Sequence, residues 1–401
     1  MRISTRFCAI ATALAIAACT TAPPPKPMIP APPAPLAANP LNQDLPSFLR
    51  LPGLADGTPV RVGIILPFSS SAASSRALAQ SMLKAAELAL FDSGNRSILL
   101  MTADDGNGGA QAAQAAQKLL AQGAEVIVGP LFGASVEVVA PIARDRGVPV
   151  LAFSTEKRMA GNGTYLLSFL PQNEVRRVVD YAAANGHRNF AALVPQTAYG
   201  DVAQAAFQDS VAAAHGTVVD VERFAPMTSA VPAAADAVAK SGADAVLIAQ
   251  GGTILRTIAP TLSFDGMARD KVKLLGTGLW DDDQALAREA ALEGSWYAAP
   301  SPNGDADFIA KYRAAYGAAP AQLSSLAYDA VSLVALLSQG QPYHRFTPAA
   351  LMDPNGFAGV NGIFRFNADG TSERGLAVLE MTPAGPVVVS PAPTTFQRAA
   401  F

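Results

Sequence analysis

Apolar and polar positions alternate in blocks along most of the chain. Short runs of apolar β-formers are followed by longer segments that carry apolar residues at helical spacing. The clearest block starts with Val126-Ile127-Val128, which stops at Gly129-Pro130, and ends with a second apolar run from Val148 to Phe153. Between them, Ser135 suits a helix N-cap and Gly147 suits the C′ position. This pattern predicts strand, loop, helix and strand, the size of one βαβ unit.

The same alternation continues on both sides of this block and predicts mostly parallel sheets with helices on both faces. Two extended segments, 165–170 and 295–300, are expected to cross between two lobes, and 362–366 with 376–381 reads as a hairpin. The expected strands are 60–66, 97–103, 126–128, 148–153, 190–194, 218–224, 245–249, 272–275 and 386–389. The expected helices are 76–91, 110–121, 174–185, 201–214, 231–240, 254–262, 308–316 and 323–337.

Polar residues follow several of these strands. Ligands of open α/β sheets bind beyond the carboxyl ends of the strands. Ser69 and Ser70 come after the first strand, Ser135 follows the third, and Ser154 and Thr155 follow the fourth. Each hydroxyl also has an ordinary role as a cap or turn residue.

The N-terminus has the features of a secretory signal. Residues 1–6 are positively charged, and the apolar run that follows is too short to span a membrane. Ile16-Ala17-Ala18-Cys19 resembles a bacterial lipobox, so 1–18 is expected to be a lipoprotein signal peptide and Cys19 the lipid attachment site. The alternative is an ordinary signal in which Cys19 is incidental. Residues 19–57 include an Ala/Pro-rich stretch expected to form a tether of about 3 Å per residue.

Composition excludes several function classes. The 401 residues suffice for two domains with cores, and the net charge of -3 with no long basic run argues against a nucleic-acid groove. Two cysteines near the N-terminus and three scattered histidines predict no metal site. No G-x-S-x-G, P-loop or H-E-x-x-H motif occurs, so neither a catalytic residue nor a cofactor is expected. Asp281-Asp282-Asp283 is interpreted as a helix cap, with a metal or ammonium site as the alternative.

Several segments resemble a known family. The order VGPLFGAS, a helix, then GVPVLAFST is similar to the first lobe of type I periplasmic-binding proteins, the Leu/Ile/Val-binding class. LLGTGLWDDD and DPNGFAGVNGIFRF look like the penicillin-binding-protein activator lipoproteins within that class. The likeness covers about 58–390. It implies a two-lobed fold, with 58–168 plus 300–340 in the first lobe and 169–299 plus 341–395 in the second.

The resemblance also implies where a ligand would bind. In the family, hydroxyls and backbone N–H groups of the first lobe hold a carboxylate, and an aromatic and an acid of the second lobe hold an ammonium. Ser154 and Thr155 match the hydroxyl loop, and Tyr199 matches the aromatic. Gly133 stands where a serine is common, and 250–253 stands where the acid is expected, so an ammonium would lack its partner. The cleft candidates are Ser69, Ser70, Ser135, Ser154, Thr155, Tyr199, Gly252, Thr253 and Asp281.

The function that the resemblance implies is contact activation of a peptidoglycan-synthesising penicillin-binding protein. The protein would be lipid-anchored on the periplasmic face of the outer membrane, since Thr20 rather than Asp follows Cys19. Nothing in the sequence resembles the helical-repeat N-terminal domain of the longer activators. The alternative is a substrate-binding receptor that delivers an amino acid or related solute to an ABC transporter, and an enzyme is a third choice. Trp280 is interpreted as either part of an exposed partner surface or a buried anchor.

Overall fold

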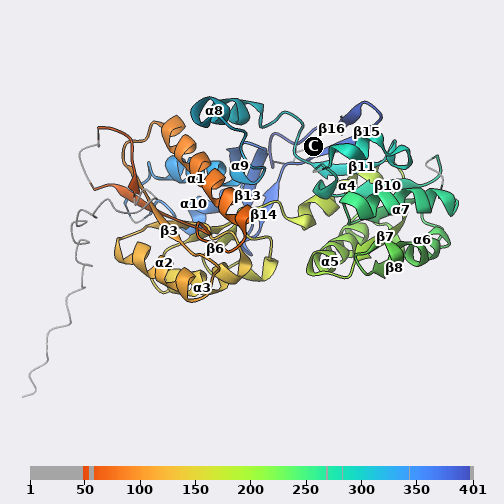
Figure 1. Ribbon diagram of the computed structural model, residues 1–401, viewed down its shortest axis with the longest axis horizontal. Coiled ribbons are helices and arrows are strands. Elements are labelled where there is room, and N and C mark those ends of the chain that lie inside the picture. Colours follow the sequence, from red (N-terminus) through yellow and green to blue (C-terminus); the bar gives the residue numbers. More distant parts are fainter. Residues whose placement is uncertain (1–47, 54–57, 268–269, 282, 343, 398–401) are drawn as a thin grey trace, which may run out of the picture. The chain divides into compact units, whose positions relative to one another are not determined.

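The computed structural model describes residues 48–53, 58–267, 270–281, 283–342 and 344–397. The predictions for the signal peptide, Cys19 and the Pro-rich stretch lie outside these residues. The described part confirms the predicted α/β class, with two large sheets, each mostly parallel and covered by helices on both faces (Figure 1). None of the helices described combines the length and the apolar character needed to cross a membrane.

The first lobe is built on a six-stranded sheet in the order β1-β3-β2-β4-β5-β6, parallel except for β1 at one edge. Helices α1 and α9 pack together on one face, whereas α2 and α3 contact each other and the other face. The strands are β1 (Phe48–Leu49), β2 (Val60–Leu66), β3 (Ile98–Asp104), β4 (Val126–Val128), β5 (Val150–Ala152) and β6 (Thr164–Leu166). The helices are α1 (Ala73–Ser93), α2 (Ala110–Ala121), α3 (Gly133–Arg144), α8 (Ala306–Tyr316), α9 (Ser324–Leu337) and α10 (Pro348–Leu351).

The second lobe is built on a seven-stranded sheet in the order β16-β15-β11-β10-β9-β7-β8. Strands β8, β7, β9, β10 and β11 pair in parallel in that order. Strands β15 and β16 are antiparallel and extend the sheet beyond β11. The strands are β7 (Asn189–Pro195), β8 (Thr217–Phe224), β9 (Ala245–Ile248), β10 (Lys273–Gly276), β11 (Trp296–Ala299), β15 (Ala377–Thr382) and β16 (Gly385–Ser390). The helices are α4 (Pro171–Ala184), α5 (Ala198–Ala213), α6 (Val231–Ala239) and α7 (Gly252–Phe264).

Alternation along the strands divides the second lobe into two cores. Ala191 and Leu193 of β7 pack in the core beneath α6 and α7, and their neighbours Phe190 and Val194 pack in the core beneath α4 and α5. Successive strand side chains point to opposite faces, so a strand that is buried on both faces is apolar throughout. This explains why the sequence shows continuous apolar runs rather than alternation.

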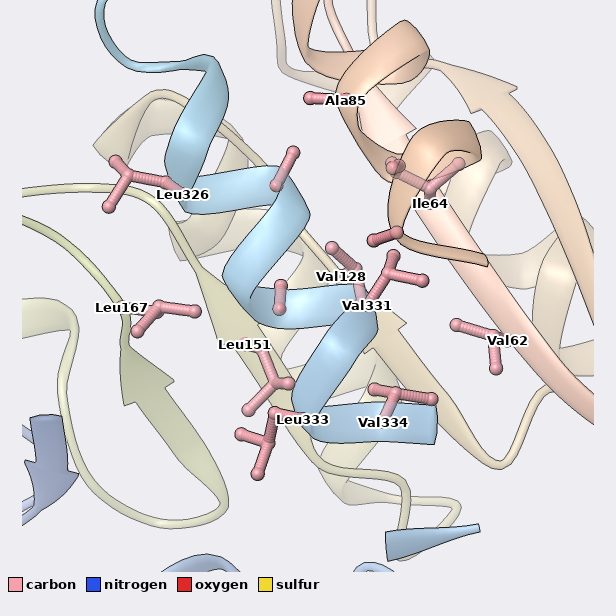
Figure 2. Close-up of a cluster of buried hydrophobic side chains, with 14 of the residues drawn as sticks. Val62, Ile64, Ala85, Val128, Leu151, Leu167, Leu326, Val331, Leu333 and Val334 are labelled. Atoms are coloured by element: carbon pink, nitrogen blue, oxygen red, sulfur yellow. The ribbon is translucent and has the colours of Figure 1, made fainter. Parts of the chain in front are cut away.

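Helix α9 completes the core of the first lobe although it lies more than 150 positions after β6. Its apolar residues join the cluster formed by α1 and the first sheet. Figure 2 shows this cluster, with labelled side chains from α9, from α1, from the strands and from the segment after β6. They are Leu326, Val331, Leu333, Val334, Ala85, Val62, Ile64, Val128, Leu151 and Leu167. The predicted helix over 323–337 is therefore confirmed.

The C-terminal part differs from the prediction in two respects. The expected hairpin of 362–366 with 376–381 is wrong, because β13 (Gly362–Phe366) pairs with β12 (Phe357–Gly359) and β14 (Ser372–Arg374) in a separate small sheet, while β15 joins the second lobe. The division that placed all of 341–395 in the second lobe also differs from the packing. Phe346, Phe357 and Phe364 lie in the core of the first lobe.

The start of α3 also differs from the prediction. Ser135 is not the N-cap: α3 begins at Gly133, and Phe132 occupies the N-cap position without a side-chain capping hydrogen bond. Gly129, with φ 86°, makes the turn after β4, where a side chain would overlap the carbonyl of Ile65. This tight turn lets the helix begin three residues earlier than an N-cap at Ser135 would place it.

A buried ion pair joins α9 to the segments that connect the lobes. Asp329 of α9 and Arg374 of β14 are each 1% exposed, and Asp329 Oδ2 lies 3.5 Å from an Arg374 guanidinium nitrogen. Arg374 Nε donates to the carbonyl of Ser168 at 3.2 Å, and its guanidinium lies over the Phe169 ring at 4.6 Å. Asp329 Oδ1 accepts the backbone N–H of Val360 at 2.7 Å. The pair therefore fixes three chain segments.

We expect Asp329→Ala to lower the free energy of unfolding by about 3–5 kcal/mol, because it leaves the Arg374 charge buried without a partner. Asp236→Ala, which breaks the exposed Lys240–Asp236 pair on α6, should change it by less than about 1 kcal/mol. Urea unfolding followed by circular dichroism measures both. Equal effects of the two substitutions would contradict the role assigned to the buried pair.

Candidate functional site

The loop after β2 and the loop after β3 are tied together at the carboxyl edge of the first sheet. Ser70 is buried, and its Oγ donates to Asn107 Oδ1 at 3.2 Å. Ser69 is exposed; its backbone N–H donates to Asp104 Oδ1 at 3.1 Å, and its Oγ accepts from Gln111 at 3.2 Å. The predicted residues Ser69 and Ser70 thus lie at this edge, and both are satisfied by the neighbouring loop.

Asp105 lies beside these residues and was not singled out from the sequence. Its side chain is fully buried, and neither carboxylate oxygen has a hydrogen-bond partner among the described residues. Burial raises the pKa of Asp105 to about 6; the nearby Ser135 hydroxyl lowers this pKa, and the Asp104 charge raises it further. Ser135, 2% exposed, therefore lies in the first turn of α3 next to a buried acid rather than capping the helix.

The loop after β5 brings a carboxylate to the start of α3. Ser154 Oγ accepts the backbone N–H of Glu156 at 3.1 Å, a local turn, and Thr155 is exposed. The Glu156 carboxylate lies against Gly133, so close that a side chain at that position would overlap it. Arg158 donates to Glu156 Oε2 from Nε and from a terminal guanidinium nitrogen, at 3.0 and 2.8 Å. An acid therefore stands among the hydroxyls predicted to hold a ligand carboxylate.

The second lobe presents an aromatic hydroxyl and an acid at its own carboxyl edge. Tyr199 OH lies 2.8 Å from Thr277 Oγ1 in the loop after β10. Glu174, in the first turn of α4 and 9% exposed, accepts the backbone N–H of Gly278 at 3.0 Å. Burial raises the pKa of Tyr199, and the Glu174 charge raises it further. The acid that the sequence lacked at 250–253 is thus present near Tyr199, contributed by another helix.

The start of α7 carries a cation instead of an acid. Gly252 is the first residue of the helix, with φ 61°, and Thr253 follows it. Arg256 donates to Thr253 Oγ1 at 3.2 Å and lies 4.0 Å from Asp283 Oδ2. The start of α7 therefore contributes a cation close to Asp283, and the acid at this edge of the second lobe is Glu174.

The acidic run near 281 is structural in the part that is described. Asp281 is exposed and accepts the Tyr297 hydroxyl at 2.9 Å, and Asp283 accepts the backbone N–H of Ala285 at 3.0 Å. Trp280 is 1% exposed and donates to the carbonyl of Gln250 at 3.0 Å, which makes it a buried anchor and not part of a partner surface. The described residues contain no group of three His, Cys, Asp or Glu placed to hold a metal ion.

Two cavities of 240 and 290 Å³ lie elsewhere, along α9. Tyr328 and Ser332 line both, and none of the predicted cleft residues lines either. The candidate site therefore consists of the loops at the carboxyl ends of the strands and does not include these two cavities.

Three acids near the site were missed from the sequence. Glu156 follows the predicted Ser154 and Thr155 directly. Its position in the loop after a strand could have identified it as a candidate site residue. Asp105 follows β3 in an acidic pair that the sequence showed only as a turn. Glu174 gave no local signal, because it approaches Gly278 only through the folding of α4 beside β10.

A family comparison agrees with this architecture. A model of the periplasmic binding protein family matches residues 59–386. The chain belongs to the periplasmic binding protein family. No curated protein sequence matches the chain.

Solved structures share the fold. A protein of Rhodospirillum rubrum, assigned as a branched-chain amino acid ABC transporter, has a TM-score of 0.73 at 19% identity, covering 82% of this chain and 100% of its own. A substrate-binding protein of Desulfitobacterium hafniense in complex with Leu has a TM-score of 0.61 at 22% identity, covering 82% and 100%. A solute-binding protein of R. palustris in complex with benzoate has a TM-score of 0.57 at 21% identity, covering 84% and 97%.

We expect Asp105→Asn to alter how stability depends on pH. The pKa of Asp105 is about 6 in the folded protein, above the ordinary value of 3.8. The stability that the protonated side chain contributes is therefore fully present below pH 3.8. That contribution is lost as pH rises through 6, by at most about 3 kcal/mol. The variant should therefore lose less stability than the wild type between pH 4 and 7, measured by urea unfolding across that range.

Ser135→Ala provides the matched test. It removes the hydroxyl that lowers the pKa of Asp105, so the pH-dependent loss of stability should move to higher pH. A wild-type profile unchanged in both variants would mean that Asp105 does not titrate as assigned.

Proposed function

We propose that the protein is a solute-binding receptor of the periplasm that serves an ABC transporter. The observation that carries this proposal is that each of the two sheets carries polar or aromatic groups at its carboxyl edge in a periplasmic-binding fold. The solved relatives named above are transporter components, which supports a receptor over an activator. We assign no catalytic role to any residue.

The ligand chemistry of this receptor should differ from that of the relatives. Leu and benzoate, the ligands of two solved relatives, both carry a carboxylate. In this chain Glu156 lies at the first-lobe position where the resemblance placed a ligand carboxylate, and Arg256 lies near the second-lobe position of the expected acid. The first lobe is therefore a poor match to the carboxylate of a free amino acid, whereas Glu174 beside Tyr199 leaves an acid in the second lobe.

Contact activation of a penicillin-binding protein is the second candidate. The observation that favours it is the Glu156 carboxylate at the start of α3, because a contact activator needs no ligand at that place. The buried Trp280 leaves this candidate without the surface anchor predicted from the sequence. We keep it second because the relatives named above are transport proteins.

The receptor proposal is tested by a retained solute. Native mass spectrometry of the protein purified from its host should show a bound small molecule, and Tyr199→Ala should lose it because the variant removes the aromatic at the second-lobe edge. A solute at 100 times its dissociation constant would stabilise the wild type by about 2.7 kcal/mol in a thermal melt.

The control for this test is Tyr316→Phe, a tyrosine whose hydroxyl donates to the carbonyl of Lys84 in the first lobe, away from the strand ends. This variant should retain the solute. If no small molecule is found and none of a broad solute library shifts the melt, the receptor proposal is wrong. Activation of purified bifunctional penicillin-binding proteins by the same preparation would then favour the second candidate.

Lipid attachment at Cys19 is proposed from the lipobox-like sequence alone. Replacing Cys19 with Ala should move the protein from the membrane to the soluble periplasmic fraction, measured by fractionation and immunoblotting. Cys8→Ala, which changes the other cysteine within the apolar run, serves as the control and should leave the protein on the membrane. A wild-type protein that is already soluble would contradict the proposal.

A further inference from the structure

The cavity of 240 Å³ lies in the first lobe, and none of the candidate-site residues lines it. Its wall is formed by α8, by α9 and by the residues of β12 and just after it. Phe308 of α8 and Phe357 of β12 also pack in the core of this lobe. The cavity is therefore built from packed elements and is separate from the loops at the strand ends.

Two aromatic rings form part of the cavity wall. The ring centroids of Phe308 and Tyr328 lie 5.2 Å apart, with an angle of 65° between the rings. The Tyr328 hydroxyl donates to Asp92 Oδ2 at 2.7 Å, which holds that ring in place. Aromatic rings attract cations, and they also provide apolar surface for an alkyl chain.

The exposed charges of the wall do not compensate one another. Lys311 of α8 donates to Asp92 Oδ2 at 2.8 Å, so its charge is paired with an acid of α1. Asp307, one turn earlier on α8, lines the cavity, and its carboxylate has neither a hydrogen bond nor an ion pair among the described residues. The wall therefore carries one uncompensated negative charge.

The buried acid Asp329 forms another part of the wall. It is 1% exposed, and its Oδ2 accepts no hydrogen bond from any described residue. Arg374 lies 3.5 Å from Oδ2 and compensates the charge, but the two terminal nitrogens of Arg374 also lack an acceptor among the described residues. Oδ2 lies beside Gly359, which also lines the cavity. Buried polar atoms nearly always have a hydrogen-bond partner, so an N–H group in the cavity would supply the donor that Oδ2 lacks.

We propose that this cavity binds a small primary ammonium ion. The charge of the ammonium is compensated by Asp307, and one of its N–H groups donates to Asp329 Oδ2. The alkyl chain lies against the rings of Phe308 and Tyr328. This ligand site is independent of the proposed receptor function, because it shares no residue with the loops at the strand ends.

Asp305 offers a matched control for Asp307. It occupies the N-cap position of the same helix without a side-chain capping hydrogen bond, and it does not line the cavity. Asp305→Asn therefore removes the same charge from the same end of α8 and leaves the wall unchanged. Ala358 is exposed and lines the cavity, so Ala358→Leu provides a second variant that fills part of the space.

The experiment is titration of n-butylammonium into the full chain, followed by saturation-transfer NMR in about 150 mM salt, which screens distant exposed charges. The wild type should bind n-butylammonium at saturable occupancy. Asp307→Asn and Ala358→Leu should weaken this binding about fivefold or more, whereas Asp305→Asn should match the wild type. 1-Butanol, which lacks the charge, and tetramethylammonium, which lacks N–H groups, should bind the wild type more weakly than n-butylammonium.

Circular dichroism melts of each variant confirm that it is folded. The inference is overturned if the wild type does not bind n-butylammonium, if either comparison compound binds as tightly, or if folded Asp307→Asn or Ala358→Leu matches the wild type. Equal losses in Asp305→Asn and Asp307→Asn also reject it, because the effect would then come from the charge of the helix end. Tyr199→Ala, which changes the strand-end site, should retain n-butylammonium. A loss in Tyr199→Ala alone would place the ligand at the strand ends, which rejects the inference and supports the receptor.

Discussion

A parallel sheet must be covered on both faces, and this requirement shapes the whole described chain. The strands of the first lobe are buried on both sides, so their backbone pairs only within the sheet and their side chains need apolar partners on each face. Helices α2 and α3 cover one face from the local sequence, but α1 alone cannot cover the other. Helix α9 supplies the missing layer, and it can do so only if the chain leaves for the second lobe and returns.

The return of the chain brings polar backbone into the interior. The segment after β6 and the segment around β14 pass each other, and the carbonyl of Ser168 and the backbone between them need donors. Arg374 meets this need with Nε, stacks on Phe169, and has its charge compensated by Asp329 from the returning α9. Asn173 of α4 donates to the carbonyl of Ser372 and ties the second lobe to the same place. The buried pair is therefore a consequence of the crossing and links the covering helix to both connections.

The local sequence pattern predicted most helices and strands, because the long apolar runs and the turn residues between them mark where each element begins and ends. The helix over 110–121 and the strand over 126–128 agree with the sequence to the residue. The failures occur where the partner is distant. Residues 362–366 and 376–381 read as a hairpin, but their pairing was decided by β14 and by the exposed edge of β11. The start of α3 was misplaced because Ser135 is a good capping residue, but its side chain lies beside the buried Asp105 inside the first turn of the helix.

The candidate site shows a similar limit. A serine after a strand end is visible in the sequence, but whether its hydroxyl is available to a ligand depends on the adjacent loop. Ser70 is engaged by Asn107, Ser154 by the Glu156 backbone, and Tyr199 by Thr277. Hydroxyls that are satisfied in this way can be recruited by a ligand only by exchanging one hydrogen bond for another, which contributes little net free energy.

Charged side chains differ from hydroxyls in this respect. Their electrostatic interaction with a ligand acts over a longer distance, and a neighbouring hydroxyl cannot neutralise it by reorienting. The first-lobe edge carries Asp104, Asp105 and Glu156, with Arg158 turned to Glu156 and Glu137. The second-lobe edge carries Glu174 beside Tyr199 and Arg256 at the start of α7. Under the proposed receptor function, these charges would set the selectivity between solutes more than the hydroxyls that mark the family pattern.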